Sequence, residues 1–169
     1  MKKGVSFFSF GQDVNLLEAA QQAAKAGYEG VELVLSESGS LNMKTSEAEL
    51  SALRRQIEGL GLRVCAVGAW NLWENNLAGE DQKAASHAQD IIKKQIDMAA
   101  ALGADTVLVV PGWVGTPFAP GVMPYELAYE NAQKRLARLA PYAQAARVKI
   151  GVENVWNKFL LSPLEFRRF

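Results

Sequence analysis

The stretch Lys149-Ile150-Gly151-Val152-Glu153-Asn154-Val155-Trp156-Asn157 begins as a short apolar run and ends in an amide-rich turn. Side chains along a strand alternate between two faces, so Glu153 points away from the face that carries Ile150 and Val152. Ser162-Pro163-Leu164-Glu165 then has a helix-start signature, with a serine cap, a proline and a glutamate three residues after the cap. We therefore predict a strand whose C-terminal tip presents one carboxylate, followed by a loop and a helix.

The rest of the chain repeats this order of a short apolar run followed by a longer helical pattern. Strands are expected at residues 4–10, 30–35, 62–69, 106–110 and 149–155, and helices at 13–26, 46–60, 83–102 and 124–146, with a last helix beginning near 162. This alternation predicts a parallel sheet with right-handed crossovers. The loops after strands are long and those before strands are short, which suits both a doubly wound sheet and a (β/α)8 TIM barrel. The first strand-to-helix turn lacks the glycine-rich phosphate fingerprint of the doubly wound class, so we favour the α/β barrel.

The length of the chain limits how much of a barrel it can form. A (β/α)8 barrel takes about 250 residues, whereas the chain has 169 and its last residues show no helix stop signal. We expect residues 1–169 to be a single domain, the N-terminal part of a barrel with strands one to five, truncated within the fifth helix. A partial barrel exposes two sheet edges, so we expect a homo-oligomer.

Composition narrows the class of partner and the location. The 18 basic and 18 acidic side chains balance, which gives no reason to expect a nucleic acid or an anionic membrane as partner. No apolar run approaches the roughly 20 residues that cross a bilayer, and Met1-Lys2-Lys3 is not followed by a signal-peptide core. Cys65 is the single cysteine and lies in an apolar run, which predicts a buried core thiol. These features favour a cytoplasmic protein.

Two glutamates are candidates for chemistry. Glu153 ends the fifth predicted strand, and Glu32 lies within the second, in Gly30-Val31-Glu32-Leu33-Val34. Both are expected on the interior face of the sheet, where an unpaired carboxylate is costly to bury. Each is therefore either paired with a lysine or arginine, or, for Glu153, a metal ligand or general base. The residues alone leave these readings open.

Aromatic and amide side chains gather where the predicted strands end. Trp70 and Trp73 follow the third strand, Trp113 the fourth and Trp156 the fifth. Aromatic side chains on one rim can stack on a sugar or exclude water, and equally can cap the core. The same rim carries asparagines that could bind hydroxyls or end turns, and Phe7 and Phe8 could form an aromatic floor; the asparagines are Asn71, Asn75, Asn76, Asn154 and Asn157.

Residues 151–165, Gly-Val-Glu-Asn-Val-Trp-Asn-Lys-Phe-Leu-Leu-Ser-Pro-Leu-Glu, resemble the sugar phosphate isomerase/epimerase family with a xylose isomerase-like barrel. Gly27-Tyr28-Glu29-Gly30-Val31-Glu32-Leu33 and Ala99-Ala100-Ala101-Leu102-Gly103-Ala104 agree with that resemblance. It implies an isomerase or epimerase of carbohydrate metabolism that is similar to ketose 3-epimerases. These enzymes move a proton next to a ketose carbonyl through a cis-enediolate.

The resemblance also implies a divalent ion, with Mn2+ expected and Mg2+, Co2+ or Zn2+ as alternatives. Glu153 takes the strand-five role of metal ligand and catalytic acid/base, and the other ligands are expected beyond Phe169. Substrate-binding roles fall to Trp113 and Trp70 as pocket walls, Glu32 for orientation, Asn154 as support of Glu153, and Phe7 as floor. The partner is then a small-molecule sugar or sugar phosphate. The 169-residue chain alone should be inactive, because one ligand of four cannot hold a metal tightly.

Other branches of the same superfamily set the alternatives. A DNA-repair branch places histidines at the ends of strands two and three, where this sequence has Ser36-Glu37 and Trp70-Asn71. Together with the neutral charge, this disfavours a nuclease. Inosose dehydratase and hydroxypyruvate isomerase-type enzymes stay open, as does a non-catalytic sugar-binding barrel.

Overall fold

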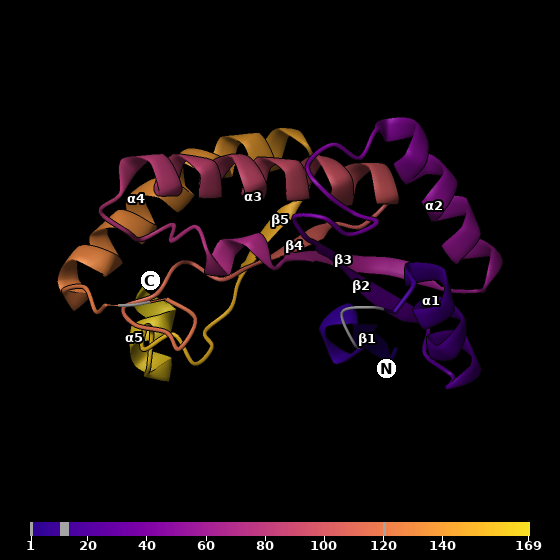
Figure 1. The fold of residues 1–169 in the computed structure, drawn as a ribbon, viewed down its shortest axis with the longest axis horizontal. Helices are drawn as coiled ribbons and strands as arrows, with labels where there is room; N and C mark the ends of the chain where they lie inside the picture. The colour runs from indigo at the N-terminus through magenta and orange to yellow at the C-terminus, as the bar shows by residue number, and fades with distance from the viewer. Residues whose placement is uncertain (1, 11–13, 120) are drawn as a thin grey trace.

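The computed structural model describes residues 2–10, 14–119 and 121–169. Within these ranges short strands alternate with helices along the whole chain (Figure 1). The strands are β1 (Gly4–Ser6), β2 (Gly30–Leu35), β3 (Arg63–Ala69), β4 (Thr106–Val109) and β5 (Lys149–Val152). The helices are α1 (Leu16–Lys25), α2 (Glu47–Gly59), α3 (Gln82–Leu102), α4 (Tyr125–Ala145) and α5 (Pro163–Arg168), with short 3-10 helices η1 (Phe7–Ser9) and η2 (Asn71–Trp73).

The strands form one parallel sheet in the order β1-β2-β3-β4-β5, so sequence neighbours are also spatial neighbours. The register pairs Ser6 with Glu32 and Leu108 with Gly151. Helices α1, α2, α3 and α4 all contribute to one core cluster that contains Val31, Leu33 and Val107, so the crossover helices pack on the same side of the sheet, as right-handed connections require. The predicted alternation of strands and helices in a parallel sheet is therefore confirmed.

Two predicted strands were too long. The first ends at Ser6, because the Ser6 hydroxyl accepts a hydrogen bond from the Phe8 N–H and starts η1 instead of extending the strand. The fifth ends at Val152, with the Glu153 N–H donating to the Val109 carbonyl at 3.0 Å as the last contact with β4. The last register pair between the two strands is Val109 with Val152. The predicted start of the first helix at Asp13 lies outside the described residues.

Local capping signals set the helix ends. Ser46 and Glu49 form a reciprocal capping box at the start of α2, as their three-residue spacing indicates. Gly103 ends α3 in the left-handed conformation, with φ of 78°, where a side chain would be strained. Asn15 and Asp81 accept backbone N–H bonds at the starts of α1 and α3.

The helices cover only one face of the sheet. Val31, Leu33 and Val107 on this outer face are fully buried in the core beneath the helices. The opposite, inner face carries Ser6, Glu32, Gly68 and Glu153, and its residues stay partly exposed except where the loops cover them. The burial of the outer face stabilises the fold, and the inner face is left for polar side chains.

The prediction that Cys65 is a buried core thiol is wrong, because the residue is exposed. A register shift separates the Val31–Val64 pair from the Glu32–Ala66 pair, and this irregularity leaves Cys65 unpaired in β3. A side-chain carbon added at Gly4 or Gly30 would lie within 3.6 Å of the Cys65 side chain, which places that side chain on the inner face. The helices therefore do not cover it.

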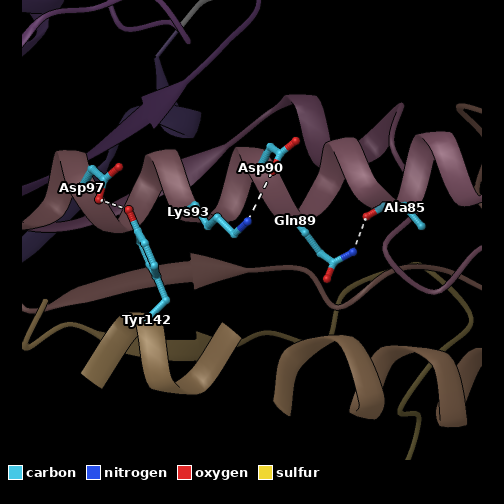
Figure 2. A network of polar contacts seen from close by, with 6 residues as sticks. All are labelled: Ala85, Gln89, Asp90, Lys93, Asp97 and Tyr142. Carbon is cyan, nitrogen blue, oxygen red and sulfur yellow. Dashed lines mark hydrogen bonds and ion pairs between the residues drawn. The ribbon is translucent and has the colours of Figure 1, made fainter. Parts of the chain in front are cut away.

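Helices α3 and α4 run side by side, with α3 packed on β3 and β4 and α4 packed on β5 (Figure 1). Figure 2 shows one contact that joins them, in which the Tyr142 hydroxyl donates to Asp97 at 2.6 Å. Along α3 itself, Lys93 and Asp90 form an exposed ion pair at 3.5 Å. None of the helices in the described ranges combines the length and the apolar character that a bilayer crossing requires.

Candidate functional site

Glu153 stands at the tip of β5, on the inner face of the sheet. Its carboxylate is half-buried, and burial first, then the nearby Glu32 carboxylate, raise the pKa of Glu153 above its ordinary value. Over the described residues, the ion pairs join Arg54 to Glu58, Lys93 to Asp90 and Lys149 to Asp105. Glu153 has no cation partner among them, so the ion-pair reading of this residue finds no support.

Glu32 lies on the same inner face and is also partly exposed. The Ser6 hydroxyl donates a hydrogen bond to Glu32 Oε1 at 2.5 Å, across the β1–β2 pair. Glu32 also lacks a lysine or arginine partner within the described ranges. Charge-assisted hydrogen bonds of this kind hold a carboxylate in a fixed orientation. The alternating pattern of β2 therefore predicted the face of the sheet on which Glu32 lies. Its hydrogen-bond partner Ser6 is known only from the pairing of β1 with β2 in the structure.

The aromatic floor is built by Phe8 more than by Phe7. Phe8 meets Trp70 edge to face with ring centroids 4.6 Å apart. A side-chain carbon added at Gly68 would lie 3.0 Å from the Phe8 ring, so glycine leaves room for that ring on the inner face. Phe7 instead packs against the main core and lies 5.4 Å from Phe10.

Three aromatic residues from the segments after β3, β4 and β5 form a partly exposed cluster, here called the aromatic triad. Trp73 and Trp156 are stacked at 5.0 Å, and Phe118 meets both rings at 5.3 and 4.9 Å. Phe118 and Trp156 are 57% and 60% exposed, which is unusual for such large apolar side chains. Sequence reasoning placed both tryptophans on this rim but missed Phe118, whose position in the long loop after β4 was the available signal.

Hydrogen bonds from an asparagine side chain to its backbone hold Trp113 in place. Asn76 accepts from the Trp113 N–H at 3.0 Å and donates to the Trp113 carbonyl at 2.9 Å. The fully buried Asn157 donates to the carbonyl of the preceding Gly112 at 2.7 Å. Within the described part of the chain, the Trp113 indole N–H is buried with no acceptor. Two rim asparagines thus fix the loop that carries Trp113.

Asn154 is exposed, and its amide donates to the Leu160 carbonyl at 3.4 Å. The contact closes the loop after β5 on itself and does not involve the Glu153 carboxylate. Asn154 therefore lies beside Glu153 in the sequence without a hydrogen bond to it. Its proposed supporting role would act only through the backbone of this loop.

A cavity of about 690 Å3 opens beside the C-terminal ends of β2 and β3, and we call it the rim cavity. Its walls combine aromatic rings with carboxylates, hydroxyls and an amide. The aromatic members are Phe7, Phe10, Trp70, Trp73 and Phe118. Neither Glu32 nor Glu153 belongs to its lining, so the rim cavity is separate from the inner-face carboxylates.

The inner face fits a divalent cation only in part. An oxygen donor such as Glu153, partly desolvated and without a counter-charge, is the type of ligand that Mn2+ and Mg2+ prefer. No group of three or more histidine, cysteine, aspartate or glutamate side chains comes together in the described ranges to complete such a site. Glu153 can therefore act as one ligand, and the others would have to come from elsewhere.

The chain matches the sequence model of the xylose isomerase-like TIM barrel over residues 20–169. Among solved structures it is similar to D-psicose 3-epimerase from Clostridium cellulolyticum H10, crystallised with D-tagatose, with 17% identity and a TM-score of 0.80. That match covers 98% of this chain and 57% of the epimerase. No curated protein matches the chain.

Two further structures agree on the fold. An L-ribulose 3-epimerase is 21% identical to the chain, with a TM-score of 0.71; the match covers 94% of this chain and 51% of the epimerase. A sugar phosphate isomerase/epimerase from Parabacteroides distasonis ATCC 8503 is 17% identical, with a TM-score of 0.61; the match covers 89% of this chain and 50% of that protein. The chain thus spans about half the length of these structures. The predicted fold class, part of a (β/α)8 barrel with five parallel strands, is confirmed.

Proposed function

The chain belongs to the xylose isomerase-like TIM barrel family, and we propose that it forms strands one to five of a metal-dependent sugar isomerase or epimerase. Ketose 3-epimerases and sugar phosphate isomerase/epimerases share its fold. The observation that carries the proposal is the Glu153 carboxylate, which lies half-buried at the tip of β5 without a cation partner among the described residues.

Glu153 would serve as the base that takes a proton from the carbon next to a ketose carbonyl, and as the acid that returns one. A raised pKa makes a carboxylate a stronger proton acceptor, and Glu153 has this property through burial and the nearby Glu32. Glu32, fixed by Ser6, would set the electrostatic environment of Glu153 and help orient the sugar. Phe8 and Trp70 would keep water from the inner face.

We propose Glu153 as the one metal ligand that this chain supplies, with Mn2+ as the expected ion and Mg2+, Co2+ or Zn2+ as alternatives. A bound divalent ion would polarise the carbonyl oxygen and so acidify the adjacent C–H group. Because the described residues offer no cluster of three ligands, this chain alone should bind the ion weakly and turn over no substrate. The partners proposed are a small sugar or sugar phosphate and further copies of the chain; the cytoplasmic location stays a prediction.

A non-catalytic sugar-binding role is the second candidate. The observation that favours it is the rim cavity, whose aromatic and polar walls could hold a sugar without any contribution from Glu153. Exchange of a substrate proton separates the two candidates, because a binding protein would hold the sugar and leave its C–H bonds intact.

The test uses the protein as its natural host produces it, incubated with D-fructose in heavy water with and without Mn2+. We expect deuterium to enter at C3, only with the metal ion, as followed by proton NMR. Glu153→Gln should abolish the exchange, while the exposed Glu58→Gln should leave it unchanged. Near-normal exchange by Glu153→Gln would show that Glu153 is structural, and binding without exchange would favour the non-catalytic role.

A further inference from the structure

We propose that the rim cavity is a recognition site for the hydroxyl groups of an unphosphorylated sugar, with Glu37 and Asn71 as its hydrogen-bonding pair. The proposal rests on the proposed sugar substrate and deepens it, since it commits to a neutral sugar over a sugar phosphate. At about 690 Å3, the cavity lies within the size range of small-molecule sites.

The polar contact in this cavity is already organised. Asn71 is 3% exposed and donates through Nδ2 to Glu37 Oε2 at 2.7 Å. This bond fixes the orientation of the amide, because the reversed amide would set its oxygen against the Glu37 carboxylate. Asn71 Oδ1 is consequently left buried with no hydrogen-bond donor among the described residues.

A buried acceptor without a donor is rare in native proteins and carries a desolvation cost. The second carboxylate oxygen of the exposed Glu37 could accept a sugar hydroxyl as a charge-assisted bond. A small movement of the Asn71 side chain would bring its buried oxygen within reach of a second hydroxyl. Both groups therefore call for donors, which hydroxyl groups supply and phosphate oxygens do not.

The walls around this pair suit the apolar faces of a sugar ring or chain. Trp70 and Trp73 line the cavity and are braced from outside it, Trp70 by Phe8 and Trp73 by Trp156. Stacking of a C–H face on such rings, together with hydroxyl contacts to an acid–amide pair, is a combination that an extended polyol can satisfy.

The loop that carries Glu37 is pre-formed by its own hydrogen bonds. The Ser36 N–H donates to the Leu41 carbonyl at 3.0 Å, and the Gly39 N–H donates to the Ser36 hydroxyl, also at 3.0 Å. Asn42 closes the turn by donating to the Gly39 carbonyl at 2.8 Å. A loop fixed in this way loses little entropy when a ligand binds.

The charge of the cavity opposes a phosphate. Glu37 and Glu74 are both in its lining, and none of the described lining residues is a lysine, arginine or histidine. A phosphate group in the cavity would meet two carboxylates without a compensating cation, a repulsion that weakens with added salt. An uncharged sugar meets no such penalty.

The position of the cavity indicates which part of a sugar it would contact. Glu153 lies outside the lining, yet Trp156, three residues further along the same loop, stacks on Trp73 in the cavity wall. Because Glu153 lies outside the lining, the Glu37–Asn71 pair would contact hydroxyl groups other than the one at the reacting carbon.

The experiment is a titration of the full chain with D-fructose and with D-fructose 6-phosphate, followed by intrinsic tryptophan fluorescence, to which Trp70 and Trp73 in the cavity wall contribute. We expect D-fructose to bind about tenfold more tightly than the phosphate ester at low salt, and the ratio to narrow as salt screens the carboxylates. Glu37→Gln should weaken D-fructose binding about fivefold or more through loss of a charge-assisted acceptor. Glu80→Gln, which removes the same charge outside the lining, should leave both affinities unchanged.

Equal or tighter binding of the phosphate ester, or no binding of either sugar, would overturn the proposal. An unchanged D-fructose affinity in a folded Glu37→Gln protein would also overturn it. The salt dependence of binding to the wild-type chain is a further test that needs no variant. Glu153→Gln should retain D-fructose binding in this cavity. Wild-type protein that binds D-fructose but exchanges no proton in the presence of the metal ion would contradict the proposed function alone. Exchange by a protein that does not discriminate between the two sugars would contradict this inference alone.

Discussion

The side-chain amide of Asn76 hydrogen-bonds both backbone polar groups of Trp113, with its oxygen 3.0 Å from the Trp113 nitrogen and its nitrogen 2.9 Å from the Trp113 oxygen. The same oxygen also accepts from the Ala78 N–H at 3.1 Å. One buried amide therefore joins the loop after β3 to the loop after β4. The position of the Trp113 side chain depends on this link.

Asn76→Ala should destabilise the protein by about 2–4 kcal/mol, because it leaves several backbone groups without partners in a buried setting. Urea unfolding measures the change, and the fluorescence of the native state should shift as the Trp113 loop relaxes. Asn75→Ala is the matched control, since within the described residues the Asn75 side-chain amide makes one hydrogen bond, to the Asn71 carbonyl. Equal losses for the two variants would contradict a special role for Asn76.

Gly112→Ala should cost about 3 kcal/mol or more. Gly112 has φ of 115°, and an added side-chain carbon would lie 2.5 Å from the Ala78 side chain and 2.6 Å from Asn76 Oδ1. Backbone strain and overpacking therefore combine at this position. Thermal unfolding should show a clear drop in Tm.

Gly59→Ala provides the control for that glycine, because nothing lies within 4 Å of its added carbon and it belongs to α2. It should be neutral or stabilise by about 0.5–1 kcal/mol, since alanine loses less entropy in a helix. A similar Tm for the two alanine variants would show that the crowding at Gly112 is relieved by small shifts.

Glu153→Gln should change the pH dependence of stability. The pKa of Glu153 in the folded protein is raised above 4.5 by burial and by Glu32, so the folded state holds its proton more tightly than the unfolded state. The contribution of Glu153 to the free energy of unfolding is complete below the pKa that Glu153 has in the unfolded state. It is lost as pH rises through the pKa that Glu153 has in the folded state. The variant should thus match the wild type near pH 4 and be more stable at pH 7, as denaturant unfolding at both values would reveal. A variant less stable at pH 7 would reverse the sign and imply a hidden partner.

Tyr125→Phe should loosen the loop between β5 and α5. The Tyr125 hydroxyl accepts from the Leu160 N–H at 2.8 Å and donates to Glu165, and burial first, then this Glu165 contact, raise the pKa of Tyr125 to about 12. Loss of the hydroxyl should cost about 1–2 kcal/mol in urea unfolding. Tyr28→Phe is the control, since no hydrogen bond of the Tyr28 hydroxyl occurs among the described contacts.

Tyr125 should also make the stability of the protein depend on pH in alkaline solution. Between the ordinary value of 10 and about 12, the folded state keeps the Tyr125 proton while the unfolded state loses it. Stability from this group is therefore present below pH 10 and falls as pH rises towards 12. The Asp97 hydrogen bond also raises the pKa of Tyr142, so ultraviolet absorbance of tyrosinate should show late-titrating tyrosines in the wild type. The amplitude of this late phase should fall in Tyr125→Phe and should not vanish.

Periodicity and local signals in the sequence were enough to predict the order of elements and the faces of key side chains. The β2 range was predicted to the residue, and Glu32 and Glu153 lie on the inner face as their alternation indicates. The helix starts at Ser46 and Ser162 follow from capping that involves only neighbouring residues. Information of this kind is local, so one sequence contains it.

Tertiary structure decided which of those side chains meet. The Asn76–Trp113 and Asn71–Glu37 contacts join residues more than 30 positions apart, and Phe118 joins the aromatic triad from a loop without regular periodicity. Ser6 ends β1 because a side-chain hydrogen bond competes with the ladder, which no strand pattern reveals. The sequence by itself therefore determined the elements and their faces, whereas the pairs that shape the rim depend on how the loops pack in space.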